Sequence, residues 1–119
     1  MDKRDQFAEV IAMYHRYGWE LRRALLTAET RVETSSDTGL FANLPIRDAP
    51  IDALWFSRSS AKAREAWELR LVAETPYALF EAFEPDETEE QREEVRLEME
   101  ARMREYVKSP LPVEEGLSG

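Results

Sequence analysis

The chain has 119 residues, of which 43% are hydrophobic and 10% aromatic, and this is enough for one folded domain with a buried core. It contains no cysteine, which excludes disulfides, thiolate metal ligands and cysteine nucleophiles. Its 16 basic and 25 acidic residues leave a net charge of −9. Because such a chain repels nucleic-acid phosphates and anionic lipid, we expect neither nucleic acid nor a membrane as partner.

No targeting signal is visible in the sequence. The residues from Met1 to Gln6 lead into a mixed polar and apolar stretch, whereas a secretory signal has a continuous apolar run. No window approaches the roughly 20 apolar residues that a membrane span needs. We therefore expect a cytoplasmic protein.

Apolar residues recur at steps of three and four in the first part of the chain. This spacing, typical of one face of a helix, is formed by Phe7, Val10, Ile11, Tyr14, Gly18, Leu21 and Leu25. It predicts a helix over about 3–26, in which Gly18 marks a kink or a close approach to a neighbour. Between Thr27 and Asp52, turn-forming residues take over, and Pro45 and Pro50 discourage a helix. We predict an ordered loop there, with one short edge strand as an option.

Three strands are predicted next, over 51–57, 66–72 and 77–84. Their connections are too short for parallel crossovers, so an antiparallel meander is expected. The composition of 61–74 would also suit a helix.

We prefer a strand within 61–74, because Trp67, Leu69 and Leu71 alternate with polar residues.

The last predicted element is a helix that ends near Lys108. Thr88 and Gln91 have the spacing of a capping box. An apolar stripe follows, made of Val95, Met99, Met103 and Tyr106. Together these elements predict a single α+β domain over 1–108 in two layers, namely a helix, a three-stranded meander and a closing helix. The segment 109–119 is predicted to be a flexible tail.

This order of elements in a small acidic chain resembles the small dimeric chaperones of bacterial type III secretion. The resemblance is architectural and is carried by no residue motif. It implies a homodimer that binds a protein partner.

No catalytic or metal-binding arrangement stands out. His15 is the only histidine, and no nucleophile motif accompanies it. The acidic residues between Glu81 and Glu94 have neither the spacing nor the central glycine of an EF-hand calcium loop. We therefore expect no catalytic residue, no metal site and no cofactor.

Aromatic residues are concentrated on the predicted strands and suggest an interface. Both faces of the sheet are partly apolar, which would leave one face for a second copy or a protein partner. The candidate interface residues are Trp55, Phe56, Phe80 and Phe83. A glutamate at whichever of Trp55 and Phe56 is exposed should then abolish association and leave the circular dichroism spectrum intact. Complete burial of both side chains in one monomer would remove this argument.

Our leading hypothesis is thus a non-enzymatic, homodimeric interaction module. A second hypothesis is a small-molecule binding protein, or an enzyme of unusual type, with a pocket between sheet and helices. Its candidate ligand-binding residues are His15, Tyr14, Trp67 and Arg70. A third is a regulator whose acidic last helix mimics nucleic acid.

Overall fold

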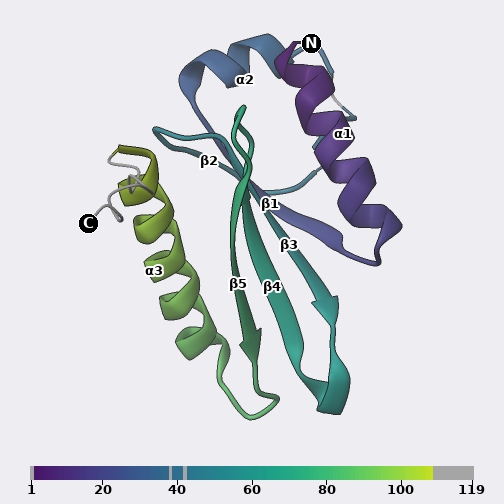
Figure 1. Cartoon of the computed structure of the whole chain (residues 1–119), viewed down its shortest axis with the longest axis vertical. Coiled ribbons are helices and arrows are strands. Elements are labelled where there is room, and N and C mark those ends of the chain that lie inside the picture. The colour runs from purple at the N-terminus through teal and green to yellow at the C-terminus, as the bar shows by residue number, and fades with distance from the viewer. Residues whose placement is uncertain (1, 38, 42, 109–119) are drawn as a thin grey trace, which may run out of the picture.

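The computed structural model describes residues 2–37, 39–41 and 43–108. Its elements are α1 (Lys3–Arg16), β1 (Glu20–Leu26), α2 (Ala28–Thr34), β2 (Ile46–Asp48), β3 (Ala53–Ser59), a 3-10 turn (Ala61–Ala63), β4 (Glu65–Leu71), β5 (Tyr77–Phe83) and α3 (Glu89–Lys108) (Figure 1). In this part of the chain, no helix has the length and apolar character to cross a membrane. The predicted tail over 109–119 lies outside the described residues.

The strands form one five-stranded mixed sheet in the order β2-β1-β3-β4-β5. β2 pairs with β1 in parallel, and the other three pairings are antiparallel. The predicted α+β class is confirmed, and so are the three strands of the meander, which correspond to β3, β4 and β5. The predicted three-stranded sheet was too small, because β1 and β2 extend it.

The predicted long first helix is wrong after Arg16. Gly18 has a φ of +89°, and the chain turns there in a Schellman motif, in which the N–H of Gly18 bonds the carbonyl of His15 and the N–H of Trp19 bonds that of Tyr14. β1 follows. Leu21 and Leu25 continue the helical spacing by coincidence, since the register of β1 shifts between Leu21 and Arg23 and the two leucines pack on opposite faces of the sheet.

The segment 27–52 is more regular than predicted. Thr27 caps α2 by accepting the backbone N–H of Thr30 at 3.2 Å. Asp52, which is only 7% exposed, accepts the Thr27 N–H at 2.9 Å and the Thr30 hydroxyl at 2.7 Å. These bonds fix α2 to the start of β3. The optional edge strand is present as β2.

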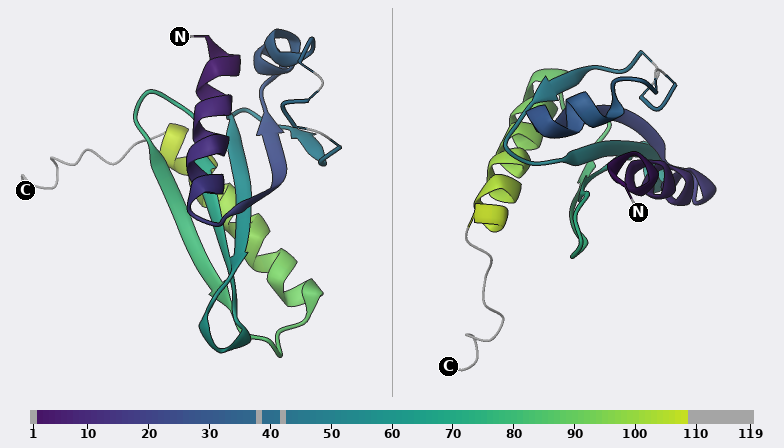
Figure 2. Two further views of the ribbon diagram at one scale, coloured as in Figure 1. Left: turned by 90° about the vertical axis from the view of Figure 1, so that its right-hand side faces the viewer. Right: turned by 90° about the horizontal axis from the view of Figure 1, so that it is seen from above.

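The two long helices cover opposite faces of the sheet (Figure 2). One core cluster joins Phe7 and Tyr14 of α1 to β1 and β3, and the other joins Met99 and Met103 of α3 to β3, β4 and β5. The predicted two-layer arrangement, with both helices on one face, is therefore corrected to three layers. This also explains why both faces of the sheet are apolar.

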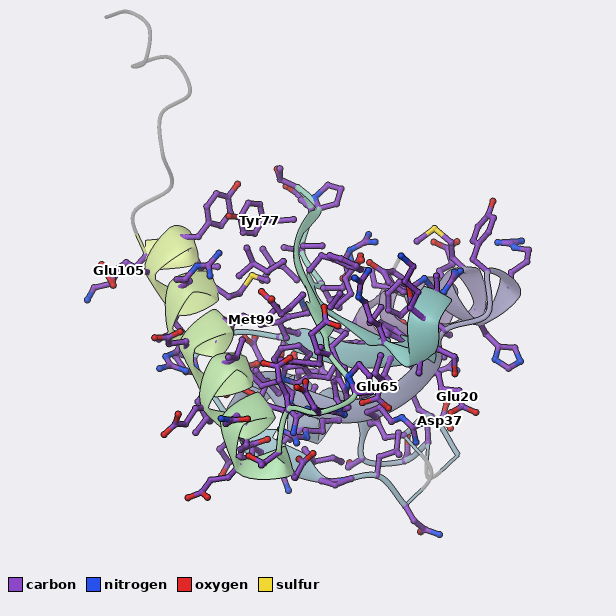
Figure 3. The ribbon with its side chains drawn as sticks, turned by 90° about the horizontal axis from the view of Figure 1, so that it is seen from below. Glu20, Asp37, Glu65, Tyr77, Met99 and Glu105 are labelled. Carbon is purple, nitrogen blue, oxygen red and sulfur yellow. The ribbon has the colours of Figure 1, made fainter. Side chains whose placement is uncertain are left out.

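α3 packs as its sequence predicts. Thr88 Oγ1 accepts the Gln91 N–H at 3.1 Å, and Gln91 Oε1 accepts the Thr88 N–H at 2.9 Å, so the capping box is confirmed. Met99 of α3 lies in the core, and Figure 3 labels it together with Tyr77 of β5. The ring of Tyr77 stacks on Tyr106 with centroids 3.7 Å apart. These contacts hold α3 across β4 and β5.

Candidate functional site

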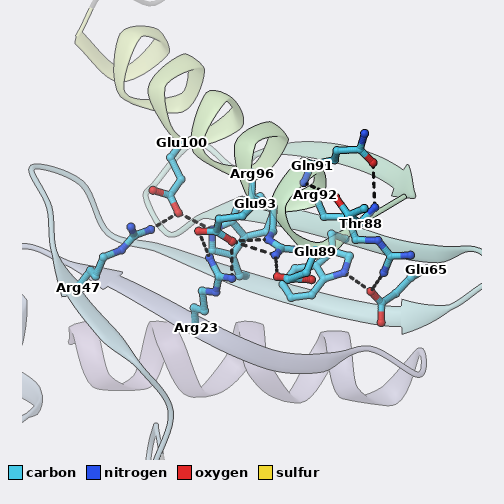
Figure 4. A network of polar contacts seen from close by, with 12 residues as sticks. Arg23, Arg47, Glu65, Thr88, Glu89, Gln91, Arg92, Glu93, Arg96 and Glu100 are labelled. Atoms are coloured by element: carbon cyan, nitrogen blue, oxygen red, sulfur yellow. Dashed lines mark hydrogen bonds and ion pairs between the residues drawn. The ribbon is translucent and has the colours of Figure 1, made fainter. Parts of the chain in front are cut away.

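A cluster of arginines and carboxylates lies between the sheet and α3 (Figure 4). Arg96 is 1% exposed, and its guanidinium lies 4.3 Å from the centre of the Trp67 ring. It bonds Glu93 and Glu89, while Arg23 of β1 bonds Glu93 Oε1 at 2.8 Å. The cluster therefore ties α3 to two strands of the sheet.

The carboxylates of this cluster are engaged in ion pairs. The hydrogen bond from Arg23 holds the pKa of Glu93 below its ordinary value, and Arg96 acts in the same direction. Glu100, which is buried, accepts the Trp55 indole N–H at 2.8 Å and pairs with Arg47. The lowered pKa makes Glu93 a poor proton acceptor at neutral pH. The cluster is thus an anchor for α3.

The uncovered part of the sheet lies on the α1 side. α1 covers β1 and β3 there but leaves β5 open (left panel of Figure 2). Phe80 of β5 is 58% exposed. Among the described residues, its one aromatic neighbour is Trp19, whose ring lies edge to face with the centroids 6.4 Å apart. Ala78 and Ala82 flank it on the same face of the strand. This face of β5 is an apolar surface that the described chain does not cover.

A shallow depression adjoins Phe80, which we call the aromatic depression. Its volume is about 200 Å³, and its lining consists of Met13, Tyr14, Tyr17, Trp19, Glu68 and Arg70. The Tyr14 hydroxyl donates to Glu68 Oε2 at 2.5 Å. Burial, with the hydrogen bond to Glu68, raises the pKa of Tyr14 to about 12. The phenol is therefore a hydrogen-bond donor throughout the physiological range and not a base.

Local structure places the aromatic residues of the depression. The Schellman motif at Gly18 brings Trp19 back against Tyr14, with ring centroids 6.0 Å apart. Tyr14 in turn stacks on Phe56 of β3 at 4.1 Å. The guanidinium of Arg70 lies over Tyr14. Since α1, the turn and the sheet each contribute, the depression depends on the whole fold.

The edge of β5 is also open. Every residue of β5 except Glu81 is apolar, and within the described residues no backbone hydrogen bond reaches the outer side of the strand. The opposite edge of the sheet is protected differently, because β2 has only three residues and includes Arg47 and Asp48. Short, charged edges resist pairing with other chains, whereas a long apolar edge invites it.

The structure separates the predicted ligand-binding residues. Tyr14 and Arg70 meet in the aromatic depression. Trp67 is buried on the other face of the sheet, and His15 is exposed and does not line the depression.

Of the predicted interface residues, Trp55 and Phe56 have no exposed surface and Phe83 has 1%, so a partner has no access to them. Only Phe80 is exposed. Reasoning from the sequence missed Trp19 and Glu68. The signal for Trp19 was Gly18, which follows the helix and has an aromatic residue on each side in the sequence.

Three larger depressions, of about 380 to 460 Å³, lie elsewhere on the described surface. Among residues 2–37, 39–41 and 43–108, no group of three or more histidine or carboxylate side chains is placed to hold a metal ion. A search of protein-family models, of curated proteins and of solved structures found nothing that matches this chain, which leaves the resemblance to secretion chaperones without support.

Proposed function

We propose that this chain is a non-enzymatic protein-interaction module that assembles as a homodimer through β5 and the neighbouring Phe80 face. The observation that carries the proposal is the long apolar edge strand, with an open edge and one open face. A chain that kept such an edge exposed would be prone to aggregate. Pairing with a second copy removes that exposure.

Of the four interface residues predicted from the sequence, only Phe80 supports this proposal. Trp55 and Phe56, which first suggested an interface, are fully buried, and helices on both sides of the sheet account for them. The proposed interface consists of the exposed Phe80 and the open face and edge of β5.

The aromatic depression supports binding of a protein over binding of a free small molecule. Its volume of about 200 Å³ is below the range of roughly 300–1,000 Å³ typical of small-molecule pockets. A space of this size suits one side chain of a bound partner.

A cytoplasmic location remains a prediction from the sequence.

The experiment compares two exposed apolar residues. Phe80→Glu places a charge at the proposed interface, and we expect it to raise the dimer Kd about tenfold or more, because burial of one phenylalanine contributes about 2 kcal/mol. Val32→Glu is the matched control, since Val32 is 74% exposed on α2, away from β5. Sedimentation velocity over a concentration series measures both, and circular dichroism checks the fold.

Equal association by the wild-type chain and Phe80→Glu, with an intact spectrum, would contradict the proposed surface. A loss of association in Val32→Glu alone would move the interface to α2.

A further inference from the structure

We infer that the two copies pair β5 with β5 in antiparallel fashion, in the register that sets Phe80 opposite its counterpart in the second copy. This inference rests on the proposed homodimer and specifies its geometry. The pairing would join the five-stranded sheets of the two copies into one continuous sheet. β5 is the edge of each sheet, so each copy contributes its last strand to the joint.

Symmetry restricts how β5 can pair. Most homodimers have a two-fold axis, and an axis perpendicular to the sheet makes the two edge strands antiparallel. Such an axis also keeps the α1 sides of both sheets on one face. In an antiparallel pair, residues directly opposite each other have their side chains on the same face of the sheet. The two-fold axis must therefore lie level with one residue of β5 and not midway between two consecutive residues.

Side-chain chemistry selects the residue at the axis. A register centred on Phe80 pairs all seven residues from Tyr77 to Phe83. Centring on Leu79 or on Glu81 shortens the ladder, and centring on Glu81 also places two carboxylates opposite each other, which destabilises a sheet. With Phe80 at the axis, Glu81 faces Leu79 of the other copy.

The same register buries the exposed phenylalanine. Phe80 would lie against its counterpart, with Ala78 of each copy opposite Ala82 of the other. The small alanine side chains leave room for the two rings, which prefer offset or edge-on contacts. Two aromatic depressions would then lie on one face of the joined sheet, on either side of the Phe80 pair. A partner protein would meet a surface that neither copy has alone.

The absence of cysteine makes this register directly testable. In the register, Cα atoms of opposite residues lie about 4.5–5.5 Å apart, within the span of a disulfide. We expect Phe80→Cys to form a covalent dimer on mild oxidation or with a short bifunctional thiol reagent. Val32→Cys is the control, since Val32 on α2 is 74% exposed and thus more accessible than Phe80 at 58%.

Two alanine variants test the register with Phe80 in place. Two Ala78→Cys copies would have their thiols about 14 Å apart, so neither Ala78→Cys nor Ala82→Cys should cross-link alone. A mixture of the two should cross-link at least tenfold faster than either. This mixture also serves if Phe80→Cys weakens association.

The outcomes separate the inference from the proposed function. If native mass spectrometry shows a dimer but neither Phe80→Cys nor the mixture cross-links, the register is overturned and the homodimer stands. If Ala78→Cys cross-links alone as fast as the mixture, the register is also overturned. If the chain stays monomeric at every concentration, the proposed homodimer fails and the inference fails with it.

Discussion

The rings of Trp19 and Phe80 pack edge to face with their centroids 6.4 Å apart, and this contact joins the turn after α1 to the edge strand β5. Trp19 covers one side of Phe80, which remains 58% exposed. In the proposed dimer, the exposed part of this ring lies against the Phe80 of the second copy. The proposed dimer depends on this pair of rings.

Burial separates Phe56 from Phe80 and predicts different effects. Phe56→Ala should lower the free energy of unfolding by about 3–5 kcal/mol, because Phe56 is fully buried and stacks on Tyr14. Phe80→Ala should change it by under about 1 kcal/mol in the monomer. Urea denaturation at low protein concentration measures both, and similar losses would contradict the assignment of Phe80 to the surface.

For the same reason, a glutamate at Trp55 or Phe56 should unfold the chain. The circular dichroism spectrum would then be lost, contrary to the expectation drawn from the sequence. An intact spectrum with lost association would instead support an interface at Trp55 or Phe56.

Arg96 is buried by Trp67 and Phe83, and its Nη1 has no hydrogen-bond partner among the described residues. Arg96→Ala should destabilise the protein by about 3 kcal/mol, since it removes both packing and a charge that Glu93 faces. Arg96→Met should recover most of this loss, because methionine fills the space between the rings without an unpaired N–H.

Chemical denaturation of the two Arg96 variants checks the order of stability. A methionine variant as unstable as the alanine variant would show that the ion pairs, and not the packing, hold α3.

Glu93 predicts a pH dependence. The hydrogen bond from Arg23 holds the pKa of Glu93 below its ordinary value in the folded chain, so the ion pairs of Glu93 stabilise the fold fully above that ordinary value. The contribution is lost as the pH falls through the lower folded value. Glu93→Gln should therefore reduce the fall in Tm between about pH 7 and about pH 3.

Glu94→Gln is the control for Glu93→Gln, since Glu94 is an exposed neighbour on α3. Equal pH profiles for the two variants would contradict the role of Glu93.

Tyr14 should ionise above the usual range of a tyrosine, since burial and the hydrogen bond to Glu68 raise its pKa to about 12. The absorbance difference between the wild-type chain and Tyr14→Phe should show one tyrosine that titrates well above the ordinary value near 10. Stability from the buried phenol is full at neutral pH and is lost as the pH rises through the folded value. A difference curve centred near 10 would contradict the burial of the Tyr14 phenol together with its hydrogen bond to Glu68.

The sequence predicted the elements whose local signals agree with their packing. β4 alternates clearly, and Thr88 begins α3 with a complete capping box. β1 was missed because Leu21 and Leu25 continue the spacing of α1 by coincidence, and the φ of Gly18 overrides it. α2 was missed because the turn-forming residues after it masked its Thr27 cap.

The candidate site was less predictable, because it is made by tertiary contacts. Tyr14 and Arg70 were singled out from the sequence, but their association with Glu68 requires α1 to bring the Tyr14 side chain within reach of β4. The assignment of faces failed for Trp55 and Phe56, since nothing local shows that two helices would cover opposite sides of the sheet. An exposed Phe80 follows only from the width of the sheet relative to α1.

Native mass spectrometry of the purified chain, without added ligand, tests the central claim most directly. We predict a dimer of twice the 13.9 kDa chain mass with no extra mass, and its loss in Phe80→Glu but not in Val32→Glu. A monomer that carries a reproducible small adduct would contradict the account and favour a small-molecule binding protein.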